Sequence, residues 1–168
     1  MSEPLDPSTF PLWGSRLIEA SAGTGKTWTI AALYVRLVLG HGDDATGFGT
    51  PLDPSRILVM TFTIAATREL SDRVRQRLLD AARFFRGDEG TDRDAFLEAL
   101  REGYPVGPQR AHAAWRLATA ADAMDDATVL TIDAWVQKVL REHAFDSGSP
   151  LDETLEPDPY ALLDEAAT

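Results

Sequence analysis

The stretch LIEASAGTGKT, residues 17–27, predicts a short buried strand over residues 16–20, a glycine-bearing turn, and a lysine and a threonine that begin a helix. This order of strand, loop and helix is typical of a phosphate-binding P-loop. Gly23 and Gly25 can take backbone angles that are closed to residues with a Cβ, so that successive N–H groups turn toward phosphate oxygens. The N-terminus of the helix adds a partial positive charge. The stretch therefore predicts a site for nucleotide phosphates.

The predicted site uses the loop and the first two residues of the helix. Lys26 can reach the β- and γ-phosphates and the Thr27 hydroxyl can ligate Mg²⁺, so these two are the candidate catalytic residues and Thr27 is the candidate metal ligand, through ATP. The strict pattern G-x-x-x-x-G-K-[ST] has glycine where Ala20 stands. A surface loop with an incidental lysine is the alternative. The expected cofactors are ATP and Mg²⁺, held by Ala20, Ser21, Ala22, Gly23, Thr24, Gly25, Lys26 and Thr27.

Composition indicates a single globular domain. The chain has 168 residues, 44% of them hydrophobic, and no apolar run long enough to span a membrane. It begins with an acidic segment that lacks the apolar core of a signal peptide, and it has no cysteine, so we expect a cytoplasmic protein without disulfides. The net charge of −11 has the wrong sign for a free-standing nucleic-acid binder. Only two of the sixteen basic residues are lysines, Lys26 and Lys138.

Further along the chain, residues 56–62 form a continuous apolar run, which predicts a strand buried on both faces of a parallel sheet. Thr63 is a good N-cap for a helix over residues 64–85, and helical segments follow at about 94–101 and 109–124. Residues 127–132 predict a third strand, and a helix runs from Asp133 to about residue 144. An open parallel sheet usually has about five strands or more, so we expect the N-terminal piece of a longer α/β protein.

An acidic motif that completes ATP hydrolysis is expected after an apolar strand. Asp164 and Glu165 imitate it, but Pro159 shortly before them argues against a central strand and favours the start of a helix. No other Asp-Glu pair follows an apolar strand. We therefore expect that residues 1–168 alone neither hydrolyse ATP appreciably nor unwind DNA.

Several segments, in order, resemble UvrD/Rep-type superfamily 1 DNA helicases, and within them the RecB-type subunits of helicase–nuclease complexes. Residues 17–30 resemble the first family motif, in which alanine also stands at the position of Ala20. Residues 61–70 resemble the second motif, residues 131–135 a further DNA-contacting motif, and residues 142–148 the stretch after it. The resemblance implies a P-loop NTPase (RecA-like) fold, a parallel sheet flanked by helices that is incomplete here. It implies ATP-driven translocation on single-stranded DNA or duplex ends in double-strand break repair and recombination, together with other subunits of a RecBCD-type complex.

On this resemblance, residues 1–145 are the N-terminal part of motor domain 1A with a helical insertion at about 87–125. Residues 146–168 are an acidic linker and the start of a following helical segment. The implied DNA-binding residues are Thr61, Phe62, Thr63, Thr131 and Trp135. Phe62 and Trp135 could stack on bases, or they could fill the core.

The chain departs from the family pattern at three positions. Ile64 replaces a polar residue, Trp135 replaces Phe, and Asp133 replaces a His, where a carboxylate would repel a DNA phosphate. Two other readings stay open. A small P-loop kinase should carry an arginine-rich lid and its own acidic Mg²⁺ partner, and neither is evident. A non-catalytic nucleotide-binding adaptor would bind nucleotide without turnover.

Overall fold

The computed structural model describes residues 5–21, 23–90 and 94–142. Two compact units divide the chain, one ending at Thr131 and the other beginning at Ile132. The first unit contains the helices α1 (Lys26–Leu39), α2 (Ile64–Arg86), α3 (Ala95–Glu102) and α4 (Pro108–Asp122), the strands β1 (Leu58–Thr61) and β2 (Thr128–Thr131), and the short 3₁₀ turns η1 (Pro54–Arg56) and η2 (Ala123–Asp125). The second unit contributes α5 (Ile132–Glu142). Residues 146–168, with the acidic pair at 164 and 165, lie outside the described part.

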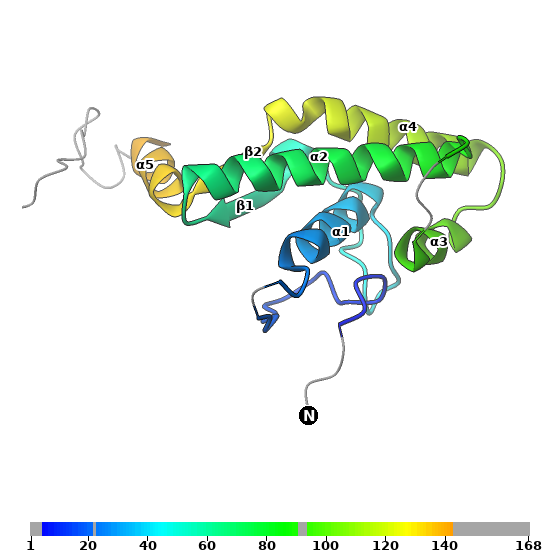
Figure 1. The fold of residues 1–168 in the computed structure, drawn as a ribbon, viewed down its shortest axis with the longest axis horizontal. Coiled ribbons are helices and arrows are strands. Elements are labelled where there is room, and N and C mark those ends of the chain that lie inside the picture. The colour runs from blue at the N-terminus through cyan, green and yellow to red at the C-terminus, as the bar shows by residue number, and fades with distance from the viewer. Residues whose placement is uncertain (1–4, 22, 91–93, 143–168) are drawn as a thin grey trace, which may run out of the picture. The chain divides into compact units, whose positions relative to one another are not determined.

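The two strands form a parallel sheet in which Leu58 pairs with Thr128 and Thr61 with Thr131. Because the strands are parallel and in register, both end at the same edge of the sheet. Helix α2 lies along the sheet and beside α4, with α1 against its other side (Figure 1). A parallel sheet covered by helices is compatible with the predicted α/β class.

The strand predicted over residues 16–20 is absent from the structure. These residues have no regular secondary structure, and Leu17 is 84% exposed. A strand needs a neighbour that satisfies its N–H and C=O groups, and among the described residues β1 and β2 pair only with each other. The local sequence of residues 16–20 cannot supply that neighbour.

Burial of β1 also differs from the prediction, because only one face of this strand is covered. Val59 packs against the core beside the buried Val129, whereas Leu58 and Met60 on the opposite face are 42% and 48% exposed. Side chains alternate across a strand, so the helices cover the face that carries the two valines.

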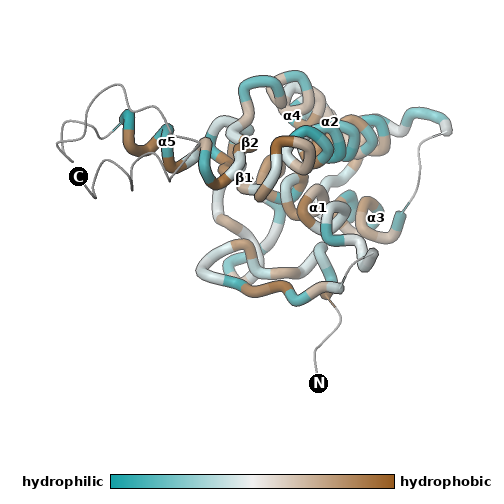
Figure 2. The backbone as a smooth tube through the Cα atoms, turned by 60° about the vertical axis from the view of Figure 1, so that its left-hand side comes forward, coloured by the Kyte–Doolittle hydropathy of each residue, from teal (hydrophilic) through white to brown (hydrophobic). Residues whose placement is uncertain are grey.

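Helix α2 confirms its prediction closely. The Thr63 hydroxyl accepts a hydrogen bond from the Ala66 N–H at 3.1 Å, as an N-cap should. Leu70, Val74 and Leu78 recur every four residues and are all buried. In Figure 2 the tube of α2 alternates between hydrophilic and hydrophobic colours, as expected of an amphipathic helix.

Helix α1 presents Ala31, Tyr34, Val35 and Val38 to the core. It also buries Arg36 completely, and this guanidinium donates hydrogen bonds only to main-chain carbonyls of the lead-in and of the loop after the helix. Helices α3 and α4 fall where the sequence predicts them. None of the described helices is long and apolar enough to cross a membrane.

Candidate functional site

The turn before α1 contains two glycines in an unusual backbone conformation. Gly23 and Gly25 have φ of 79° and 84°, in the left-handed region that residues with a Cβ rarely adopt. A Cβ built on either glycine would meet nothing within 4 Å, so the space over the loop is open. Gly25 is the N-cap of α1 and offers no side chain to satisfy the first helical N–H groups. The N-terminus of α1 is therefore available to an anion.

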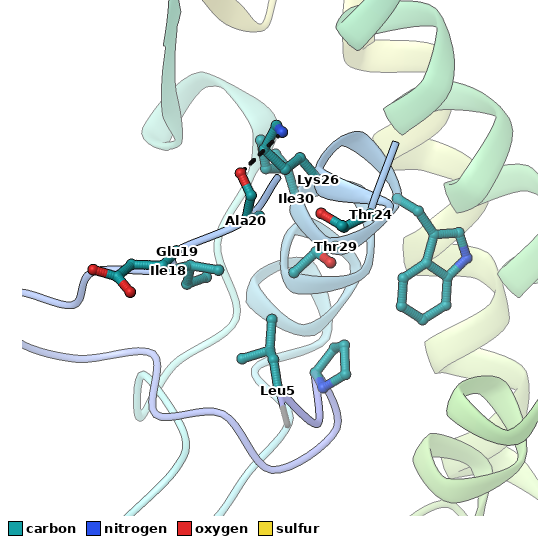
Figure 3. A pocket seen from close by; sticks show the side chains of 10 residues that line it. Leu5, Ile18, Glu19, Ala20, Thr24, Lys26, Thr29 and Ile30 are labelled. Carbon is teal, nitrogen blue, oxygen red and sulfur yellow. Dashed lines mark hydrogen bonds between the residues drawn. The ribbon is translucent and has the colours of Figure 1, made fainter. Parts of the chain in front are cut away.

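Lys26 lies folded against the loop. Its ammonium donates hydrogen bonds to the carbonyls of Ser21 at 2.6 Å and Ala20 at 3.2 Å, the second drawn in Figure 3. The Thr24 hydroxyl donates to the same Ser21 carbonyl at 2.8 Å. Carbonyl oxygens carry only a partial charge, so a phosphate would compete well for this ammonium. The lysine is thus held beside the turn in which it was predicted to act.

A pocket of about 420 Å³ adjoins the loop. The lead-in contributes Leu5 and Pro7 to its wall, opposite residues of α1 (Figure 3). The complete lining is Leu5, Pro7, Ile18, Glu19, Ala20, Thr24, Lys26, Trp28, Thr29 and Ile30. Sequence reasoning missed the lead-in here, because Pro7 is held near α1 by the buried Arg36, a contact that no local pattern reveals.

These residues fit a bound nucleotide phosphate chain. The loop offers two glycines in the required conformation, a lysine, and a helix N-terminus without a side-chain cap. Thr27 lies half-buried in the first turn of α1. Ala22 is outside the described residues. Within the described ranges no group of three or more His, Cys, Asp or Glu could hold a metal ion.

The predicted DNA-binding residues of β1 lie where the sheet ends. Thr61 is opposite Thr131, and Phe62 directly after it is 87% exposed. The alternative in which Phe62 fills the core is therefore wrong. Thr61 Oγ1 and Thr67 Oγ1 share a hydrogen bond of 2.6 Å, and Thr63 caps α2, so two of the threonines also stabilise this turn.

Trp135 and Asp133 belong to α5, in the second unit. The helix begins at Ile132, so Asp133 lies within its first turn and does not precede it. No residue of α5 is buried. Because the two units are described separately, a groove joining Thr61–Thr63 to Trp135 stays a prediction.

Comparison with known proteins gives a family for the chain. Residues 4–165 match the UvrD/REP helicase N-terminal domain. RecBCD enzyme subunit RecB of Escherichia coli (strain K12) is 44% identical over 166 residues, which are 99% of this chain and 14% of that protein. The RecB subunit of Haemophilus influenzae is 41% identical over 86% of this chain and 12% of its own length, and that of Mycobacterium tuberculosis is 33% identical over 74% and 10%.

The chain thus spans 14% or less of the length of these RecB subunits. The family match covers the glycine turn before α1, the residues Thr61, Phe62 and Thr63 at the end of β1 (the rim after β1), and the described part of α5. On that match, the chain belongs to the UvrD/REP helicase N-terminal domain family.

Proposed function

We propose that this chain is the ATP-binding part of a RecB-like, ATP-dependent DNA helicase and exonuclease subunit that acts in double-strand break repair and recombination. The main support for ATP binding is the turn before α1, which has two glycines at positive φ and Lys26 beside them. The fold proposed for the whole domain is the RecA-like P-loop NTPase fold, of which the chain supplies part. Its partners would be DNA and the other subunits of a RecBCD-type complex.

In this proposal each residue of the loop has a separate role. The backbone amides of residues 22–27 bind phosphate oxygens, and the Lys26 ammonium neutralises charge on the β- and γ-phosphates. The Thr27 hydroxyl would hold the magnesium ion that accompanies ATP, and the ion would offset negative charge on the phosphates. The pocket beside the loop, walled in part by Leu5 and Pro7, offers space next to these phosphates.

The rim after β1 is proposed to bind single-stranded DNA. Phe62 presents a ring on which a base of any sequence can stack, since every base has a π-face. Helix α2 begins two residues later, at Ile64, so a phosphate could also approach those N–H groups of its first turn that Thr63 does not cap. Because the chain carries a net charge of −11, we expect weak binding that falls strongly with salt.

Two other functions are less well supported. Membership of a helicase family argues against a small metabolite kinase. A nucleotide-binding adaptor would bind ATP without hydrolysing it. The helicase proposal instead predicts that the longer protein hydrolyses ATP and that DNA stimulates this hydrolysis. Residues 1–168 by themselves should show little hydrolysis under either reading.

The nucleotide site is tested by replacing its lysine. Lys26→Ala removes a charge-assisted contact worth about 1.5–3 kcal/mol, so ATP·Mg²⁺ affinity measured by calorimetry should fall by roughly tenfold to a hundredfold. Lys138→Ala is the matched control, because Lys138 is the other lysine of the chain and lies on α5. Equal ATP affinity of the wild type and Lys26→Ala would refute the site.

The DNA rim has its own test. Phe62→Ala should weaken binding of a short single strand, followed by fluorescence anisotropy at low salt, by about one base-stacking contact of ~1–3 kcal/mol. Phe48→Ala serves as control, because Phe48 is also exposed but lies in the loop after α1. If both variants bind DNA as the wild type does, the rim is not a stacking site.

A further inference from the structure

Arg77 of α2 lies beside a pair of aromatic rings that come from different parts of the chain. Its guanidinium carbon is 5.2 Å from the ring centroid of Trp28 in α1 and 5.1 Å from that of Phe96 in α3. The two rings also meet edge to face, with centroids 5.8 Å apart and planes at 71°. The Arg77 side chain is only 11% exposed. One side chain therefore joins three helices.

The arginine is also fixed electrostatically. Its Nη2 atom forms an ion pair with Oδ2 of Asp94, without the alignment of a hydrogen bond. Asp94 is itself the N-cap of α3, accepting from the Leu97 N–H at 2.7 Å. A planar guanidinium that contacts both rings and pairs with a carboxylate is restricted in orientation, which a lysine could not reproduce.

Trp28 makes this arrangement relevant to the phosphate loop. It directly follows Thr27 and lies in the first turn of α1, whose N-cap glycine contributes no side chain. The buried side chains of α1 begin only at Ala31, and Ile30 is exposed. Trp28 itself is 43% exposed, and its ring packs against Arg77 of α2 and Phe96 of α3.

We propose that Arg77 is a positioning residue for the nucleotide site, acting through Trp28. It holds the first turn of α1, and with it Lys26 and Thr27, in the orientation that receives the phosphates. This inference rests on the proposed ATP binding. The rest of α1 is anchored by its buried residues, so loss of the stack should disturb nucleotide binding more than the stability of the fold.

The test compares nucleotide affinity with stability in the same variants. Arg77→Ala should weaken ADP and ATP·Mg²⁺ binding by about fivefold to twentyfold, as expected for coupled neighbouring groups. Arg77→Lys should not restore it, because the ammonium lacks the planar stack. Arg83→Ala, on the same helix and more exposed, should bind as the wild type does. The urea midpoint of each variant shows whether unfolding accounts for the change.

A double-mutant cycle separates positioning from general damage. Trp28→Leu should weaken nucleotide binding by itself. Adding Arg77→Ala to that variant should cause almost no further loss of affinity, because the contact between the two side chains is already absent. Trp28→Leu also provides the test by itself if Arg77→Ala does not fold. Wild-type affinity in Arg77→Ala, or fully additive losses, would overturn the inference while leaving the nucleotide site intact. A wild type that binds no nucleotide would overturn both.

Discussion

Replacement of Arg36 by methionine should be the most destabilising single change in the lead-in and α1. The side chain is fully buried, and its guanidinium donates to the carbonyls of Pro7 at 2.9 Å, Thr46 at 3.0 Å and His41 at 3.4 Å, and also to that of Phe10. Burial lowers the pKa of Arg36, as expected for a cation taken out of water. The carbonyls replace that water, and they tie the lead-in and the following loop to the helix.

The loss of folding stability follows from the main-chain carbonyls that Arg36→Met leaves without a hydrogen-bond donor. Methionine keeps most of the buried stem but removes every donor, and an unsatisfied buried carbonyl costs about 1–3 kcal/mol. The lead-in and the loop can relax and admit water at some of the carbonyls, so we expect about 3–5 kcal/mol in total, similar to breaking a buried ion pair. For a chain of this size each kcal/mol lowers the Tm by about 2–4 °C, so Tm should fall by roughly 6–20 °C.

Urea unfolding followed by circular dichroism measures this loss. Arg36→Lys should lie between the wild type and Arg36→Met, because one ammonium cannot reach four separated carbonyls. Arg68→Met, at an exposed position of α2, should change stability by no more than about 0.5 kcal/mol. A loss below about 1 kcal/mol in Arg36→Met would show that the carbonyls find water easily and that the buried cation is not what holds the lead-in.

Two further predictions concern local stability. Thr63→Ala removes the N-cap of α2 and should cost about 1 kcal/mol in urea unfolding, whereas Thr63→Ser should retain most of it; no difference between them would refute the capping role. Burial, and secondarily the charge of Arg36, lower the pKa of His41. The folded state thus favours neutral imidazole, so stability should fall as pH drops below about 6.5, where the unfolded state takes up the proton. His41→Gln should flatten that fall between about pH 5 and 6.5, and an unchanged slope would contradict it.

Features that depend on residues close together in the sequence were predicted correctly. For α2 the cap, the four-residue step of Leu70, Val74 and Leu78, and the helix length all lie within one segment, and the structure confirms them. The glycine turn was also predictable, because Gly23 and Gly25 can adopt a positive φ at little cost, as the structure shows.

Signals that depend on distant segments failed. The sequence predicted a strand over residues 16–20, but strand formation depends on a neighbouring strand that the local sequence does not reveal. The uncovered face of β1 was missed for the same reason. Nothing in the sequence places Arg77 against Trp28 and Phe96, because that contact joins residues far apart along the chain.

The exposure of Phe62 is itself informative. Leaving such a ring in water forgoes about 1.5–3 kcal/mol that its burial would contribute, so the backbone must prevent it from turning inward. The Thr61 hydroxyl forms a hydrogen bond with that of Thr67, and Thr61 pairs with Thr131 across the sheet. The Thr63 hydroxyl accepts the N-cap hydrogen bond of α2. With both neighbours held, the residue between them has little freedom to rotate its backbone. A ring held outward in this way would lose little conformational entropy when a base stacks on it, which favours a preorganised contact at this rim.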